Sequence, residues 1–137
     1  MAQSVGEIMS SNPATVSPEA PVKEAAKLMG SEDVGSLPVV EGEKLVGVLT
    51  DRDIALRVVG EGKDPGSTKV ADIQSGDLVA VGPDQDLQEA LDEMARHQVR
   101  RLPVVDGGRL VGVVAQADVA REAGYSVTGR VVEEISE

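Results

Sequence analysis

The stretch LPVVEGEKLVGV (37–48) recurs as LPVVDGGRLVGV (102–113), at an offset of 65 residues. In each copy, two apolar runs are joined by Glu-Gly-Glu or Asp-Gly-Gly, a composition typical of a β-hairpin. Val39-Val40 and the run 45–49 are largely apolar on consecutive residues, which indicates strands covered on both faces. The duplicated hairpin therefore predicts one small supersecondary unit used twice.

The repeat extends well beyond the hairpin. Residues 5–59 align with residues 70–124 at the same offset and without a gap. Identical pairs occur along the whole alignment: Val5/Val70, Ile8/Ile73, Val16/Val81, Pro18/Pro83, Glu24/Glu89, Met29/Met94 and Val34/Val99. A unit of about 55 residues buries too little surface to be robust alone, so the two units are expected to pack together.

A helix is expected between the first extended piece and the hairpin of each unit. The extended pieces are 14–16 and 79–81, each ending at a Ser-Pro or Gly-Pro turn. Apolar residues then follow at i, i+3, i+4 and i+7, the pattern of one buried helical face. These residues are Val22, Ala25, Ala26 and Met29 in the first unit, and Leu87, Ala90, Leu91 and Met94 in the second.

The ends of these helices are also marked in the sequence. Pro21 suits the first turn of one helix, and Asp86 with Glu89 predicts a capping box at the start of the other. A second helix is expected after Thr50 and after Ala115. The order is therefore β-α-β-β-α twice, an α+β fold.

We predict two repeats, residues 1–62 and 63–124, joined by the polar, turn-rich linker 60–69. Residues 125–137 form a C-terminal tail in which Val131, Val132 and Ile135 suit a short amphipathic helix.

Composition narrows the classes of function. The net charge of −11 disfavours nucleic-acid binding, and Tyr125 is the only aromatic residue, so stacking platforms for bases are lacking. There is no cysteine, which excludes disulfides and thiolate metal sites. No apolar run approaches the roughly 18 residues that span a bilayer. We expect a cytoplasmic protein without membrane or nucleic-acid partners.

Tandem units of this kind, with Thr50-Asp51-Arg52-Asp53 at a helix start, resemble a CBS domain pair, or Bateman module, over about residues 4–124. The phrases LTDRDIALR, DPGSTKVADI and HQVRRLPVV are typical of small stand-alone bacterial CBS-pair proteins of the hypoxic-response type. The resemblance implies a pseudo-twofold Bateman module, a homodimer, and regulatory binding of AMP, ADP, ATP or S-adenosylmethionine in clefts between the repeats. It implies no catalysis and no resident cofactor, with Mg²⁺ present only alongside ATP.

The resemblance also assigns ligand-binding residues. The final acid of T-x-x-D accepts hydrogen bonds from the ribose hydroxyls, a role that falls to Asp53 and in the second repeat to Asp118. Thr50 would hold ribose or phosphate, and Ala115 replaces it in the second repeat. Arg52 is a further candidate contact. The remaining cleft positions are Gly35, Ser36, Arg100, Arg101, Val16, Pro18, Val81 and Pro83.

Elementary chemistry agrees with these roles. A carboxylate has two acceptor oxygens and can take both hydroxyls of a cis-diol. Thr50 lies at an expected helix N-terminus, which favours an anion. Arg100 and Arg101 belong to the only markedly basic stretch, RHQVRR (96–101), and offer planar forks for phosphate.

Other interpretations remain open. Thr50 with Asp53 has the spacing of a plain capping box, and Asp118 in a first helical turn gains from the helix dipole alone. The module could instead be a dimerising interaction domain that binds no nucleotide. An enzyme is disfavoured, because the sequence has no Gly-x-Ser-x-Gly elbow, no P-loop and a single histidine, His97, which is expected to be exposed.

Overall fold

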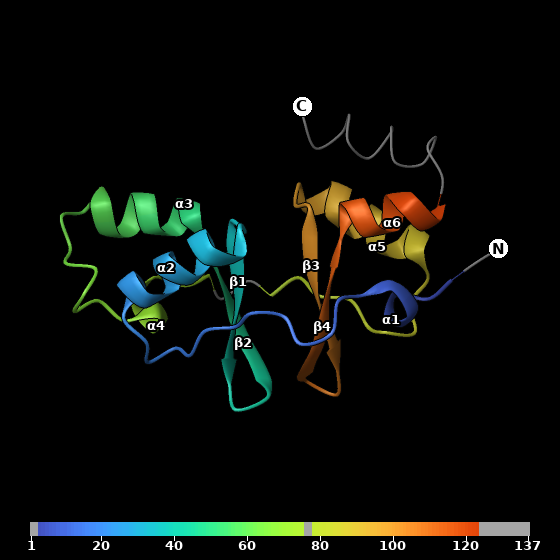
Figure 1. Ribbon diagram of the computed structural model, residues 1–137, viewed down its shortest axis with the longest axis horizontal. Helices are drawn as coiled ribbons and strands as arrows, with labels where there is room; N and C mark the ends of the chain where they lie inside the picture. Colours follow the sequence, from blue (N-terminus) through green and yellow to red (C-terminus); the bar gives the residue numbers. More distant parts are fainter. Residues whose placement is uncertain (1–2, 76–77, 124–137) are drawn as a thin grey trace. The chain divides into compact units, whose positions relative to one another are not determined.

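The computed structural model describes residues 3–75 and 78–123 and contains two compact units (Figure 1). Unit A is Ala14–Leu78. Unit B combines the chain before Ala14 with the chain from Val79 onward. The tail 125–137 lies outside the described residues. No helix in the described part of the chain is both long enough and apolar enough to cross a membrane.

Both units follow the predicted α+β order, except that each contains one additional short helix and that its expected first strand is only a single bridge. In unit A the elements are α2 (Val22–Glu32), β1 (Ser36–Glu41), β2 (Lys44–Thr50), α3 (Asp51–Ile54), the π-helical turn η1 (Ala55–Val59) and α4 (Val70–Ile73). In unit B they are α1 (Val5–Ile8), α5 (Leu87–His97), β3 (Arg101–Asp106), β4 (Arg109–Ala115) and α6 (Gln116–Ala123). The expected first strands are reduced to single parallel bridges, Val16 to Val39 and Val81 to Val104.

The two predicted hairpins are present. β1 pairs antiparallel with β2, and β3 with β4. Gly42 and Gly107 open the turns with φ of 66° and 61°, a conformation that favours glycine. Both hairpins have a register irregularity at the same place, after Val39 and after Val104. The bulge is thus part of the duplicated plan.

The short helices α1 and α4, which the sequence did not predict, pack on the unit formed mainly by the other repeat. Val5 N–H donates to the carbonyl of Gln85 at 2.8 Å, and Val70 N–H to that of Ala20 at 2.9 Å. The predicted boundary at 62/63 therefore describes the sequence repeats and not the compact units. Because each repeat begins with a helix that packs elsewhere, the structural boundaries fall at Ala14 and Val79.

The packing of α1 and α4 on the unit formed mainly by the other repeat, called here the exchange of these helices, explains the glycine in each LVGV motif. A Cβ on Gly112 would lie 2.8 Å from the carbonyl oxygen of Ser10, and one on Gly47 would lie 3.1 Å from that of Ser75. The chain leaving α1 therefore approaches Gly112 more closely than a side chain there allows, and the chain leaving α4 approaches Gly47 closely enough that a Cβ would be crowded. Glycine is thus required at 112 and favoured at 47.

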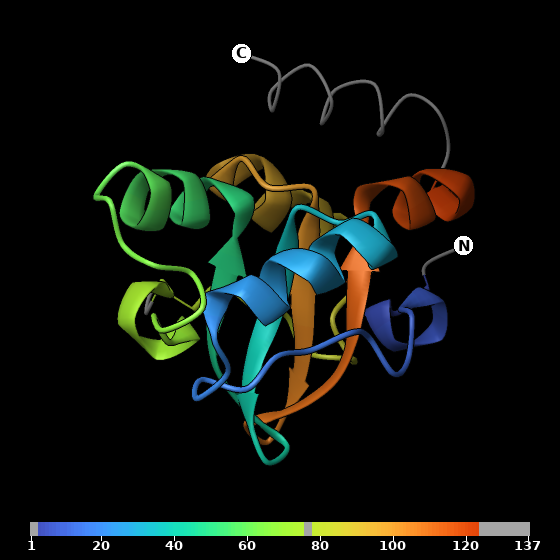
Figure 2. The same cartoon turned by 60° about the vertical axis from the view of Figure 1, so that its left-hand side comes forward.

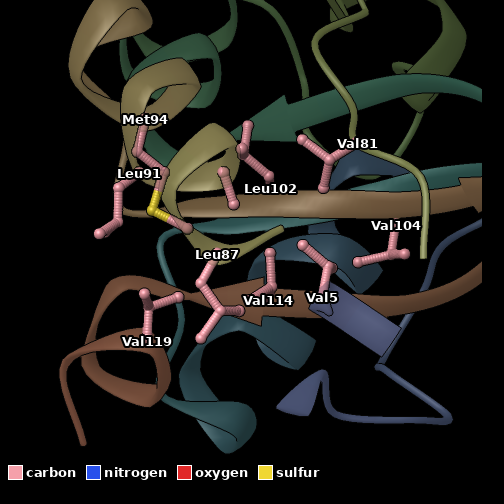
Figure 3. Close-up of a cluster of buried hydrophobic side chains, with 10 residues drawn as sticks. Val5, Val81, Leu87, Leu91, Met94, Leu102, Val104, Val114 and Val119 are labelled. Atoms are coloured by element: carbon pink, nitrogen blue, oxygen red, sulfur yellow. The ribbon is translucent and has the colours of Figure 1, made fainter. Parts of the chain in front are cut away.

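Each unit has its own hydrophobic core. In unit B, Leu87, Ala90, Leu91 and Met94 of α5 are all buried, which confirms the predicted helical face (Figure 3). In unit A, α2 lies against β1, and its buried residues are Val22, Ala25 and Met29 (Figure 2). Ala26, which was also predicted to be buried, is exposed. The buried stripe of α2 is therefore narrower than that of α5.

The two long helices begin in different ways. The predicted box at α5 is confirmed: Glu89 N–H donates to the Asp86 carboxylate at 2.9 Å, and Asp86 N–H to that of Glu89 at 3.2 Å. Pro21 is the N-cap of α2 and lies one residue before its first turn. The carbonyls of Thr68 and Pro65 in the linker accept the first two N–H groups of α2. The linker thus acts as the cap.

An ion pair ties the end of the linker to the turn before α2. The Lys69 ammonium lies 2.8 Å from a carboxylate oxygen of Glu19. This hydrogen bond and the charge of Glu19 raise the pKa of Lys69.

Candidate functional site

The candidate site of unit A lies where β2 passes into α3. Thr50 ends the strand with extended backbone and is the N-cap of the helix. Its hydroxyl oxygen accepts the N–H of Asp53 at 3.0 Å, and Asp53 Oδ2 accepts the N–H of Thr50 at 3.0 Å. The capping-box interpretation is therefore confirmed for this pair. Asp53 Oδ1 has no hydrogen-bond partner among the described residues, and the side chain is half-buried.

The equivalent place in unit B is built differently. Ala115 ends β4 and offers no hydroxyl to α6. Asp118 keeps its position in the first turn, but its carboxylate pairs with Arg121 Nη2 at 2.6 Å, and its side chain is 23% exposed. Thr50 and Ala115 occupy matching positions, so at the helix start that follows the hairpin only unit A has a full capping box. The carboxylate of unit B is instead bound to a surface guanidinium.

The residues that precede each hairpin lie beside these helix starts. Asp51 N–H donates to the carbonyl of Gly35 at 2.9 Å. Ser36 stands directly opposite Thr50 in the β1–β2 register, so these two hydroxyl residues share one face of the hairpin. A Cβ on Gly35 would approach the Asp51 carboxylate to 3.1 Å. The structure thus brings together the predicted positions Gly35, Ser36, Thr50 and Asp53.

Unit B repeats this arrangement with cationic residues. Gln116 N–H donates to the carbonyl of Arg100 at 2.8 Å, and Arg101 stands opposite Ala115 in the β3–β4 register. Both arginines are exposed. Neither guanidinium forms a hydrogen bond or ion pair with another residue in the described ranges, and the same is true of exposed Arg52 in unit A. These three cations are free to meet an anion.

Two predicted cleft residues belong to the cores. Val16 is 6% exposed and Val81 is 3% exposed, and both side chains lie in hydrophobic clusters. The backbone N–H and carbonyl of each bond to the neighbouring strand. The side chains of these two predicted cleft residues are therefore core residues, because an apolar side chain at a bridge to a hairpin is drawn into the core, and whether their backbone lines a ligand cleft stays a prediction.

The prolines two residues after these valines also form structural contacts, through their backbone carbonyls. Pro18 is buried, and its carbonyl accepts the N–H of Ala71 at 2.9 Å. The carbonyl of half-buried Pro83 accepts the N–H of Gly6, also at 2.9 Å. Their main structural role is to hold the exchanged helices α4 and α1.

Gln116 is the residue that the sequence did not single out. It is the first residue of α6, and only 8% of it is exposed. Its side-chain Nε2 is buried without a hydrogen-bond partner. A buried donor without a partner lowers the stability of the fold, so packing alone does not explain a glutamine at this position. In the sequence, the one feature that could have pointed to Gln116 is its alignment with Asp51 at the 65-residue offset of the repeat.

Two further side chains have structural roles. Arg57 donates from Nη1 to the carbonyl of Ile73 at 3.1 Å, so it binds the π-helical turn to α4. His97 lies 3.4 Å from a carboxylate oxygen of Glu93, and its side chain is 38% exposed. No group of three or more histidine, aspartate or glutamate residues placed to hold a metal ion occurs within residues 3–75 and 78–123.

Comparison with known proteins gives a consistent result. The CBS domain family model matches residues 5–60 and 70–125. The CBS domain-containing protein YhcV of Bacillus subtilis is 50% identical over 117 residues, covering 85% of this chain and 83% of YhcV. Hypoxic response protein 1 of Mycobacterium tuberculosis is 36% identical over 116 residues, covering 84% of this chain and 81% of the relative.

Solved structures share the fold. The crystal structure of Hypoxic Response Protein I with two coordinated zinc ions has a TM-score of 0.81 at 35% identity, covering 87% of this chain and 98% of that one. The CBS domain pair of MJ0100, solved with 5′-methylthioadenosine and S-adenosyl-L-methionine, has a TM-score of 0.78 at 28% identity, covering 90% and 98%. CBSX2 in complex with AMP has a TM-score of 0.76 at 30% identity, covering 88% and 95%.

Proposed function

Because the chain belongs to the CBS domain family, with two repeats, we propose that it is a non-catalytic regulatory module that binds an adenosine-containing ligand. The ligand class is AMP, ADP, ATP or S-adenosylmethionine. Support comes from the structural neighbours solved with AMP or with S-adenosyl-L-methionine. Mg²⁺ would enter only with ATP, and the module needs no resident cofactor.

The observation that carries this proposal is the carboxylate at the third helical position of both units. In unit A the capping box uses only Oδ2 of Asp53. The other oxygen, Oδ1, remains available to accept from a ribose hydroxyl, and a carboxylate can accept several hydrogen bonds at once. Capping and ligand binding are therefore compatible roles for this side chain. The box also fixes the rotamer of Asp53 before a ligand arrives.

The two units differ in whether a ligand would have to displace an existing ion pair at the site. In unit A, Ser36 and Thr50 lie on one face beside Asp53, and none of these side chains must leave an ion pair. In unit B a ribose would compete with Arg121 for the carboxylate of Asp118. Unit A is therefore the better preorganised ribose site.

Thermal unfolding with each adenosine compound tests the proposal. A ligand at 100 times its Kd stabilises the folded state by about 2.7 kcal/mol. Asp53→Asn keeps an oxygen for the Thr50 N–H but loses the charge, and it should weaken binding roughly tenfold or more. Asp72→Asn is the matched control, because Asp72 occupies the same third position in α4. No stabilisation by any of the four compounds would exclude this function.

A second candidate is a dimerising interaction module that binds no nucleotide. This candidate is favoured because both acids already bind other groups of the chain: Asp53 is part of a capping box, and Asp118 pairs with Arg121. A light-scattering mass of a dimer, unchanged in stability by every adenosine compound, would support this alternative. A homodimer is also what we propose for the ligand-binding form, so dimerisation alone does not separate the two candidates.

We propose a cytoplasmic location and no nucleic-acid partner. The net charge of −11 would repel a polyanion unless a local basic face compensated. A salt-sensitive mobility shift with DNA or RNA would contradict this part of the proposal.

A further inference from the structure

The outer face of α2 in unit A carries two charges that local structure does not explain. Lys23 lies in the first turn and Asp33 is the C-cap, and both are exposed. Neither side chain forms a hydrogen bond or an ion pair within residues 3–75 and 78–123. The helix dipole disfavours a cation at its first turn and an anion at its end. The left-handed backbone of Asp33 suits a short polar residue, but asparagine would serve there without the charge.

Two small residues lie between these charges on the same face of α2. Positions 23, 26, 30 and 33 are separated by three, four and three residues, the spacing of the seam between two packed helices. Ala26 and Gly30 are both exposed, and a Cβ on Gly30 would meet no described atom within 4 Å. Glycine is the least favourable helix residue after proline, so packing within the chain does not account for it. The close approach of a second helix would account for it, because the distance between packed helices depends on the side chains at the contact.

The stripe Lys23, Ala26, Gly30 and Asp33 is complementary to its own reversal. Lys23 and Asp33 lie five residues to either side of position 28, and Ala26 and Gly30 lie two residues to either side. In an antiparallel pair of α2 helices with a twofold axis at position 28, each Lys23 faces an Asp33 and each Ala26 faces a Gly30. Each lysine then also lies at the negative end of the partner helix. Charges that are unfavourable in one copy are therefore favourable in a pair.

The equivalent stripe of unit B lacks these properties. At the 65-residue offset it consists of Gln88, Leu91, Ala95 and Gln98. Leu91 is fully buried in the core of unit B, and Gln88 Nε2 donates to the Asp92 carboxylate at 2.8 Å. The stripe of α5 is therefore uncharged and is partly used for packing within the unit. Of these two long helices, only α2 presents an exposed, self-complementary face.

We propose that two copies of the chain associate through antiparallel α2 helices, with Lys23 of each copy paired to Asp33 of the other. The contact joins unit A to unit A and gives an interface to the homodimer proposed above. It rests on that dimeric state and is independent of nucleotide binding. The occupant of the face is a second copy, because a partner that is only acidic or only basic would satisfy one of the two charges and repel the other.

Charge reversal tests the pairing, with sedimentation velocity of the full-length protein measuring the dimer Kd. Lys23→Glu makes both ends of the stripe negative and Asp33→Lys makes both positive, so each variant should weaken dimerisation about tenfold or more. An equimolar mixture of the two variants should form a heterodimer, because both of its contacts join opposite charges. The combined Lys23→Glu/Asp33→Lys chain should dimerise alone. Lys44→Glu, the same reversal at the start of β2, is the control and should leave the Kd unchanged.

Gly30→Leu separates the interface from the stability of the fold. Within one copy the new side chain enters open space, so the urea midpoint of the monomer should not fall. In the pair it would meet the partner helix at Ala26, so the dimer should weaken about tenfold or more. The chain has no cysteine, which permits a direct test of register. Ala26→Cys mixed with Gly30→Cys should cross-link on mild oxidation faster than either variant alone.

The outcomes separate this inference from the proposed function. A wild type that stays monomeric, or charge variants whose mixture does not restore the dimer, would overturn the α2 pairing. Leu56 and Val59 of η1 are exposed apolar side chains. If Leu56→Lys/Val59→Lys dissociates the dimer while the α2 variants do not, the copies meet through another face and the inference is wrong. If the pairing is confirmed but no adenosine compound raises Tm, the interface stands and the ligand-binding function fails.

Discussion

The substitution Thr50→Ala gives unit A the residue that unit B already has at this place. It removes the hydroxyl that accepts the Asp53 N–H at 3.0 Å, and it leaves the bond from Thr50 N–H to Asp53 Oδ2 possible because that bond uses the backbone. The loss of one N-cap acceptor destabilises a protein by about 1 kcal/mol, within a range of roughly 0.5–2. For a chain of this size we expect Tm to fall by about 3–5 °C.

Urea unfolding of Thr50→Ala, with the midpoint and the m-value fitted together, measures this effect. Thr15→Ala is the control, because Thr15 is half-buried but has no side-chain hydrogen bond among the described residues. The reverse change, Ala115→Thr, should stabilise unit B by up to a similar amount. A loss above about 3 kcal/mol, or no change in either variant, would refute the view that the hydroxyl acts chiefly as a local cap.

Three further predictions concern packing and pH. Gly112→Ala should destabilise by about 1–3 kcal/mol, because its Cβ would lie 2.8 Å from the Ser10 carbonyl; an unchanged urea midpoint would contradict the close approach. Leu91→Ala should cost about 2–5 kcal/mol, since Leu91 is fully buried in unit B; calorimetry showing less than 1 would place it outside the core. Because Glu19 raises the pKa of Lys69, the contribution of this pair is present at neutral pH and is lost as pH rises through the raised pKa. Lys69→Met should abolish that alkaline dependence, and a dependence that persists would refute the assignment.

The sequence predicted those features that depend on local pattern. The i, i+3, i+4, i+7 spacing from Leu87 to Met94 defined α5 and its buried face, and Asp86 with Glu89 located its start. The duplicated hairpins follow from apolar runs around glycine turns. A single residue can still be misplaced: Ala26 matches the spacing but is exposed, because an alanine at the margin of the stripe gains little from burial.

The exchanged helices could not be predicted in the same way. α1 and α4 have four residues each, too few for any periodicity to be visible. Their partners are set by tertiary hydrogen bonds to the Pro18 and Pro83 turns, which sequence spacing does not encode. The glycines of LVGV were noticed as a repeat, but their reason, a close backbone approach, appears only in the structure.

The candidate site was predicted in part. Sequence spacing drew attention to Thr50 and Asp53, yet a capping box and a ribose site have the same spacing, so the pattern could not decide the geometry. Val16 and Val81 were assigned to the cleft, and the structure places both in the core. Gln116 escaped notice because burial of an unpaired amide has no signature in a single sequence.

Calorimetric titration of the wild type and of Asp53→Asn with S-adenosylmethionine and with AMP is the sharpest test of Asp53 as the ribose-binding residue. We expect saturable binding of at least one compound to the wild type, and an affinity lowered at least tenfold by the substitution while the fold is retained. Binding that is unaffected by Asp53→Asn, or no heat with either compound, would contradict this role.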